Sequence, residues 1–163
     1  MAAGRRGIRH AVGLMARGWS LPLVERLVVV RMLGLATIVE VGLRTIRLPL
    51  LARALGVRLN WSKQQAAPPG LPTSLGMSDR RKVTNVLRVM RHWPFAEGTC
   101  LRQSLMLGRV LKGLHPELRI GVQDRGRGIV AHAWIELDGV ALGGSDGYLP
   151  LWHTPGNNDG IAH

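Results

Sequence analysis

The amino-acid sequence predicts an α+β fold, in which helices are followed by a small antiparallel sheet. Apolar residues recur at helical spacing up to about Val110, whereas from Arg119 onward they alternate as in strands. The dipeptide Asp138-Gly139 separates two of the alternating runs, which is typical of a tight hairpin. With 163 residues, the chain is long enough for one domain with a substantial core.

Residues 1–60 are predicted to form a helical N-terminal segment. Pro22 and Pro49 would each lie near the start of a helix, and Gly56 would end the second helix. Charged residues interrupt the segment, so no run approaches the roughly 18 uncharged apolar residues that a membrane-spanning helix needs. Contact with a membrane surface stays open as an alternative, because arginines flank the apolar parts.

Residues 61–77 are predicted to be a linker, because they hold three prolines and two glycines and few periodic apolar positions. The core would then extend over residues 78–153. Ser78 is expected to cap its first helix, with one apolar face made by Val83, Val86, Leu87 and Met90. Residues 154–163 lack a core-forming pattern and are predicted to be a disordered tail.

The only cysteine of the chain lies in the stretch WPFAEGTCLRQSLMLG, residues 93–108. Pro94 and Gly98 interrupt the preceding pattern, Thr99 is a favourable N-cap, and apolar residues then recur at helical spacing. Cys100 is therefore predicted to lie in the first turn of a helix, where unpaired N–H groups and the helix dipole favour the thiolate. A single cysteine is typical of a reducing compartment, so we expect a cytoplasmic protein.

A base for this cysteine is expected on the alternating run IVAHAWIEL, residues 129–137. The alternation places His132, Trp134 and Glu136 on one face of a strand and apolar residues on the other. A cysteine at a helix start and a histidine on a later strand favour nucleophilic catalysis. A buried apolar cysteine and a structural histidine are the alternative interpretation.

The net charge of +12 is uneven along the chain. Residues 1–75 hold eleven Lys and Arg against Glu25 and Glu40, which gives +9. Such a basic half could attract an anionic membrane surface or an acidic partner. No nucleic-acid partner is expected, because recognition signatures for nucleic acid do not accompany the charge. Neither a metal site nor a cofactor is expected, since metal-ligand spacings and Gly-rich phosphate loops are missing from the sequence.

Four runs of the sequence resemble a known family: LRTIRLPLLARALGVRL, WPFAEGTCLRQSLMLGRVLKGL, LRIGV and AHAWIELDGVAL. They resemble the transglutaminase-like cysteine peptidases that remove the leader in bacterial lasso-peptide biosynthesis, the microcin-maturation type of B protein. The resemblance covers roughly residues 43–151. It implies a papain-like core in which Cys100 attacks the last peptide bond of the leader and His132 is the general base. It also implies two partners besides the precursor peptide, a separate leader-binding protein and an asparagine-synthetase-like cyclase.

The third catalytic residue departs from the family pattern, because Gly144 occupies the position of the family's acidic residue. Asp138 and Asp146 compete for the role. Asp138 is expected in the turn itself, whereas a hairpin brings residues 144–146 back opposite His132, so Asp146 is chosen. Two other functions stay open. An amine acceptor in place of water would give transglutamination, and Gly144 would suit a non-catalytic binding module.

Overall fold

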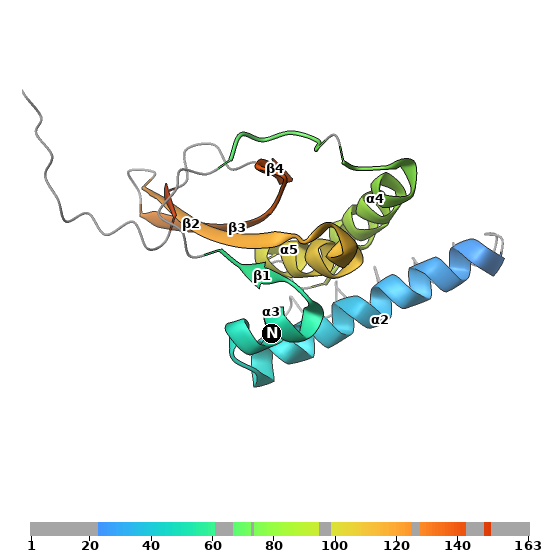
Figure 1. Ribbon diagram of the computed structural model, residues 1–163. Helices are drawn as coiled ribbons and strands as arrows, with labels where there is room; N and C mark the ends of the chain where they lie inside the picture. Colours follow the sequence, from blue (N-terminus) through green and yellow to red (C-terminus); the bar gives the residue numbers. More distant parts are fainter. Residues whose placement is uncertain are drawn as a thin grey trace, which may run out of the picture.

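The computed structural model describes residues 23–60, 67–72, 74–94, 99–124, 128–142 and 149–150. Within these residues the chain forms helices and one sheet, which confirms the predicted α+β class (Figure 1). The helices are α2 (Leu23–Thr45), α3 (Leu48–Leu55), α4 (Met77–Arg91), α5 (Thr99–Val110) and the 3-10 helix η1 (Lys112–Leu114). The strands are β1 (Arg58–Leu59), β2 (Glu117–Asp124), β3 (Ile129–Leu137), β4 (Val140–Leu142) and β5 (Leu149–Pro150).

The sheet has the order β1-β2-β3-β4, and β5 pairs with β2. Strands β2, β3 and β4 pair antiparallel as predicted, but β1 pairs parallel with β2, so the sheet is mixed. Strand β1 was not predicted, because it has two residues, which are too few to show alternation. Two hydrogen bonds hold β1 against β2. The amide of Arg58 donates to the carbonyl of Pro116, and the amide of Asn60 donates to the carbonyl of Leu118.

Two predicted helix ends, both in α3, are confirmed, and one, at the start of α4, is wrong. Pro49 lies in the first turn of α3, and Gly56 ends it with a φ of 75°, a conformation that glycine adopts without strain. The expected cap at Ser78 is wrong, because α4 begins at Met77 and Gly76 is its N-cap. Among the described residues, no helix combines the length and apolar composition needed to cross a membrane.

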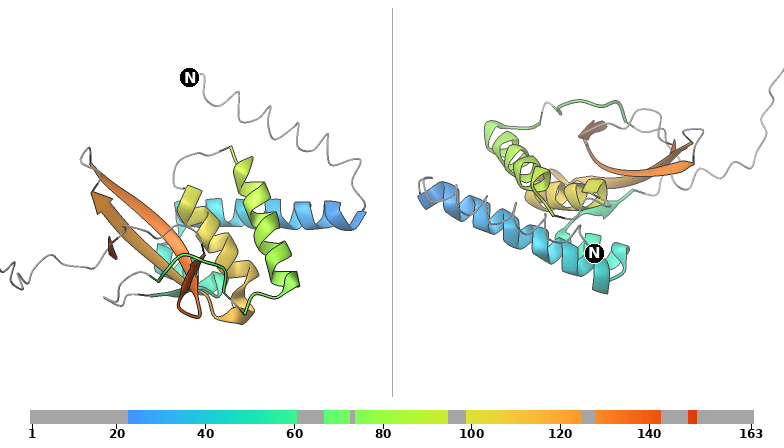
Figure 2. Two further views of the ribbon diagram at one scale, coloured as in Figure 1. Left: turned by 90° about the horizontal axis from the view of Figure 1, so that it is seen from above. Right: turned by 180° about the vertical axis from the view of Figure 1, so that it is seen from behind.

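The two faces of the sheet are covered by different parts of the chain. Helix α5 packs on one face, with α4, α2 and α3 arranged around it (Figure 2). On the opposite face the amide of Ala67 donates to the Glu136 carboxylate, and the segment 67–72 then pairs with the edge of β4 through hydrogen bonds between Gly70 and Ala141 and between Ala141 and Pro68. The described residues of the predicted linker are thus part of the folded structure. The predicted tail, 154–163, lies outside the described residues.

A single hydrophobic core joins the helices to the sheet. Its fully buried members come from α2, α4, α5 and β3 among other elements, and they include Val39, Val86, Leu105, Met106, Leu118 and Ile135. The helices α2 and α3 of the N-terminal half therefore share one core with α5 and the sheet. The predicted segments 1–60 and 78–153 meet in this core.

Replacing Gly108 by alanine should destabilise the protein. A Cβ atom there would lie 2.5 Å from Cγ2 of Val57, a buried side chain whose branching at Cβ limits its rotation. We expect a loss of about 1–3 kcal/mol in the free energy of unfolding. Gly34→Ala is the matched control, because nothing lies within 4 Å of the added atom. It should add about 0.5–1 kcal/mol through helix propensity. Urea denaturation measures both, and equal effects would contradict the close packing at Gly108.

Candidate active site

Cys100 lies in the first turn of α5, as predicted. Its side chain is half-buried and packs against the hydrophobic core, and its thiol is not in a disulfide. The helix continues through a buried run of Ser104, Leu105 and Met106, which fixes α5 against the sheet. The first turn of α5 therefore has a defined position relative to β3.

His132 lies on β3, opposite Gly121 of β2. Because Gly121 has no side chain, the imidazole has room above its cross-strand neighbour. The imidazole stacks on the indole of Trp134, with ring centroids 6.0 Å apart and an interplanar angle of 19°. The stacking places both rings on the same face of the strand, as the alternation predicted.

Two contacts set the register between α5 and β3. The Ser104 hydroxyl donates to the carbonyl of Ala133 at 2.9 Å, and a Cβ atom on Gly108 would lie 3.3 Å from Cδ1 of Ile135. Helix and strand thus run in the same direction, since four helical residues advance about 6 Å and two strand residues about 6.6 Å. One turn before Ser104, the same register brings Cys100 to the level of residues 131 and 132.

The imidazole of His132 and the body of α5 lie on opposite faces of β3. Ala133 and Ile135 belong to the core that α5 contacts, whereas His132 shares the other face with Trp134.

A buried ionic cluster supports the face of β3 that carries His132. The Glu136 carboxylate accepts hydrogen bonds from Nε of Arg119 at 2.8 Å, from Nε1 of Trp134 at 3.0 Å and from the amide of Ala67 at 3.0 Å. These donors come from β2, from β3 and from the segment that covers the sheet. The cluster holds the indole on which His132 stacks. The cluster was not predicted from the sequence, although the predicted strands place Trp134 and Glu136 on one face of β3 and Arg119 on its partner strand.

Replacing Glu136 by glutamine should strongly destabilise the fold. The Arg119 guanidinium, which is buried, would keep its charge and lose the carboxylate. Breaking a buried ion pair from one side costs about 3–5 kcal/mol. Asp79→Asn is the control, since Asp79 pairs with Lys82 near the surface and such pairs contribute about 1 kcal/mol or less. Urea denaturation compares them, and equal losses would show that Glu136 does not stabilise the charge of Arg119.

A second ionic cluster connects α2 to the cysteine helix. The buried Glu40 carboxylate pairs with Arg102, two residues after Cys100, and with Arg44 at 2.7 Å. Hydrogen bonds from Arg102 lower the pKa of the Glu40 carboxyl, and both positive charges add to this, while burial opposes it. Because the pKa is lower in the folded protein, the cluster stabilises the fold above the ordinary carboxyl pKa. That stability is lost as the pH falls through the lowered value.

Comparison with known protein families identifies the fold. The family model described as "Transglutaminase-like superfamily" matches residues 42–152, more than half of the chain. The protein belongs to the transglutaminase-like superfamily. The match spans α3, α4, α5 and the whole sheet, and so includes both Cys100 and His132. Searches of curated proteins and of solved structures found no match.

The two candidates for the acid of this transglutaminase-like domain have different outcomes. Asp138 has a φ of 50° and forms the β3–β4 turn with Gly139, which confirms its predicted place in the turn. Six residues of strand, about 20 Å, separate it from His132. Asp146 and Gly144 lie outside the described residues, so the choice of Asp146 stays a prediction. Within the described part of the chain, no group of three or more His, Cys, Asp or Glu residues is arranged to hold a metal ion.

Proposed function

We propose that the protein is a cysteine peptidase that removes the leader peptide from a ribosomally synthesised lasso-peptide precursor. Membership of the transglutaminase-like superfamily supports cysteine-based acyl chemistry. The α5–β3 register is the observation that carries the proposal, because it keeps Cys100 and His132 at the same level of the domain. The two side chains lie on opposite sides of β3, so the proposed proton transfer would take place around the edge of the strand. The lasso-peptide substrate rests on the resemblance of the motifs around these two residues.

The proposed reaction has two steps. Sγ of Cys100 attacks the carbonyl carbon of the last leader residue, and His132 takes the thiol proton and gives it to the leaving amine. The backbone N–H of Cys100 is one donor to the oxyanion. Water, deprotonated by His132, then attacks the thioester, which releases the leader as a carboxylic acid and restores the thiol. The core peptide leaves with a free N-terminal amine.

The proposed partners follow from this product and from the domain organisation. A cyclase of the asparagine-synthetase type would use the free amine to close the macrolactam ring. In the described part of the chain, helices α2 and α3 precede the first strand, and they do not resemble a strand-rich leader-binding domain. We therefore propose that a separate protein presents the leader, and that the reaction takes place in the cytoplasm.

The partner requirement can be tested with purified components. We expect slow cleavage of the precursor by this protein alone and faster cleavage when the proposed leader-binding protein is added. Mass spectrometry follows both products over time. Equal rates with and without the partner would contradict the division of roles.

The same assay separates hydrolysis from acyl transfer. In water labelled with heavy oxygen, hydrolysis places the label in the leader carboxylate, whereas transfer to an added primary amine gives an unlabelled leader amide. We expect the labelled acid even with the amine present. A leader amide as the main product would favour the transferase, and an intact precursor under all conditions would end the peptidase proposal.

A further inference from the structure

Helix α2 has a second apolar face, which the rest of the described chain leaves exposed. Its large apolar side chains are exposed by more than half, at 75% for Leu23, 64% for Leu27, 63% for Val30, 60% for Ile38 and 53% for Val41. They follow one another at spacings of three or four residues, or of eight across Gly34, and so lie along one side of the helix. The opposite side, with Ala36 and Val39, is buried in the core. We call the exposed residues the α2 stripe.

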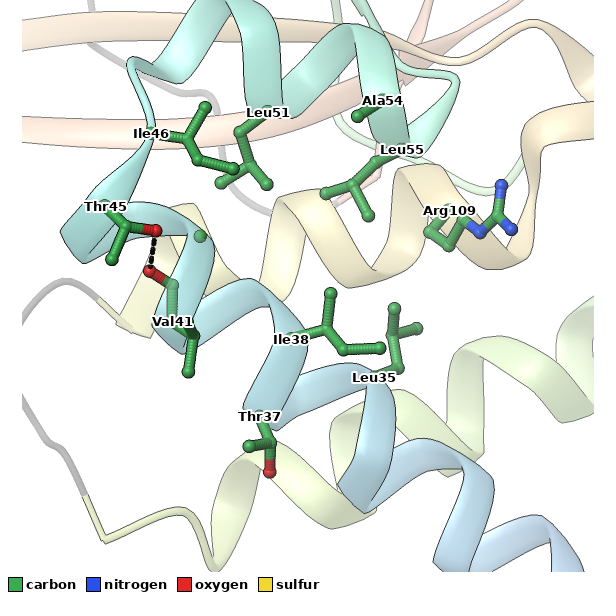
Figure 3. A pocket seen from close by; sticks show the side chains of 11 residues that line it. Leu35, Thr37, Ile38, Val41, Thr45, Ile46, Leu51, Ala54, Leu55 and Arg109 are labelled. Carbon is green, nitrogen blue, oxygen red and sulfur yellow. Dashed lines mark hydrogen bonds between the residues drawn. The ribbon is translucent and has the colours of Figure 1, made fainter.

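The α2 stripe continues into a groove between α2 and α3 (Figure 3). The groove has a volume of about 520 Å³, and neither Cys100 nor His132 lines it. Its walls are mostly aliphatic side chains of the two helices and of the turn between them, together with Thr37 and Thr45, and Arg109 of α5 lies at one end. The stripe and the groove together form a continuous apolar surface on the outside of the helical layer. An exposed apolar surface of this extent marks a site of association.

The charges around this surface are almost all positive. Residues 23–60 contain six arginines and two glutamates, and one of the glutamates, Glu40, is buried in its ion pairs. Arg31, Arg47 and Arg53 are exposed on α2 and α3 or on the turn between them. Two copies of the chain would bring these like charges together, so charge disfavours self-association through this face. An anionic occupant fits better.

The composition of the surface favours a lipid occupant over a protein. The α2 stripe is purely aliphatic, whereas the cores of protein interfaces are enriched in aromatic residues. Aliphatic side chains between arginines are typical of helices that lie in a membrane interface, where long basic side chains reach the headgroups. Anionic headgroups would also be attracted by the positive charge of this half of the chain.

We propose that the α2 stripe and the adjoining groove bind the surface of an anionic phospholipid bilayer, with α2 lying in the plane of the membrane. The site is separate from Cys100 and does not depend on the peptidase function. It would hold the protein at a membrane with its sheet facing away from the lipid, because α2 and α3 form the layer farthest from the segment 67–72 on the other side of the sheet (Figure 1).

Vesicle co-sedimentation of the full chain tests the proposal. We expect binding to phosphatidylcholine vesicles that contain roughly a quarter phosphatidylglycerol, weak binding to pure phosphatidylcholine, and loss of binding at high salt. The double variant Leu27→Gln/Val30→Gln removes apolar contact without changing charge. It should weaken binding by about tenfold or more, since moving one such side chain into water has an effect of that order.

The double variant Met77→Gln/Leu87→Gln is the matched control, because both residues are exposed on α4, away from the α2 stripe. It should bind vesicles like the unmodified chain, and circular dichroism should show both variants folded. The proposal is wrong if the unmodified chain does not bind anionic vesicles, or if both double variants lose binding equally. It is also wrong if sedimentation velocity shows a dimer that only the α2 variant separates, with vesicle binding unchanged.

Discussion

Replacing Cys100 by alanine should abolish cleavage of the precursor and leave the protein folded. The substitution removes only the sulfur atom with its hydrogen. In the proposed reaction no other side chain can form the thioester. Cys100 is half-buried at the start of α5, so the change removes little packing from the core. Without the nucleophile, catalysis should fall by several orders of magnitude, as it does when one member of a catalytic triad is removed.

Mass spectrometry of the precursor after incubation with the variant measures this effect. Val110→Ala is the control, because Val110 is also half-buried in α5 but lies about 15 Å along the helix from Cys100. That variant should be slightly less stable and fully active. The chain has one cysteine, so alkylation by iodoacetamide gives an independent measurement on the unmodified sequence. Full activity of the alanine variant or of the alkylated protein would exclude Cys100 as the nucleophile.

Replacing Asp146 by asparagine should reduce the cleavage rate by about 10⁴-fold and leave the fold unchanged. In the proposed triad, the carboxylate accepts the ring N–H of His132 and holds the tautomer that can take the thiol proton. An amide at this position favours the wrong tautomer, which is the cause of an effect of that size in other triads. The folded state should not change, because the substitution keeps the size of the side chain.

Asp138→Asn, in the β3–β4 turn, is the matched substitution. Asp138 and Gly139 have φ values of 50° and 73°, a turn conformation that Asn-Gly adopts as readily as Asp-Gly. The Asp138 variant should therefore be stable and active. Single-turnover cleavage rates and circular dichroism of the two variants decide the assignment. If Asp146→Asn cleaves at the normal rate and Asp138→Asn is folded but inactive, the acid has been assigned to the wrong residue.

Local signals in the sequence were sufficient for the elements that carry the candidate nucleophile and base. The helix that carries Cys100, the alternation of β3 and the turn at Asp138-Gly139 each depend on a few adjacent residues, and the structure contains all three. Thr99, which was expected to cap α5, lies within the helix instead. Strand β1 was missed because its partner lies 59 residues later in the sequence, and the Arg119–Glu136 pair was missed because it depends on the exact register between β2 and β3. Alternation along β3 shows that two faces exist. It does not show that the segment 67–72 covers the second face and buries Glu136.

The parallel pairing of β1 with β2 has a consequence for the order of folding. Arg58 pairs with Glu117, a separation of 59 residues in the sequence, whereas β2, β3 and β4 are joined by short connections. Closing the long loop costs more chain entropy than forming the hairpins, so β1 should join the sheet late. During synthesis at about 5–20 residues per second, β1 would wait roughly 3–12 s for its partner. Helix α3, which precedes β1, would also lack its packing next to the sheet until β2 has been synthesised.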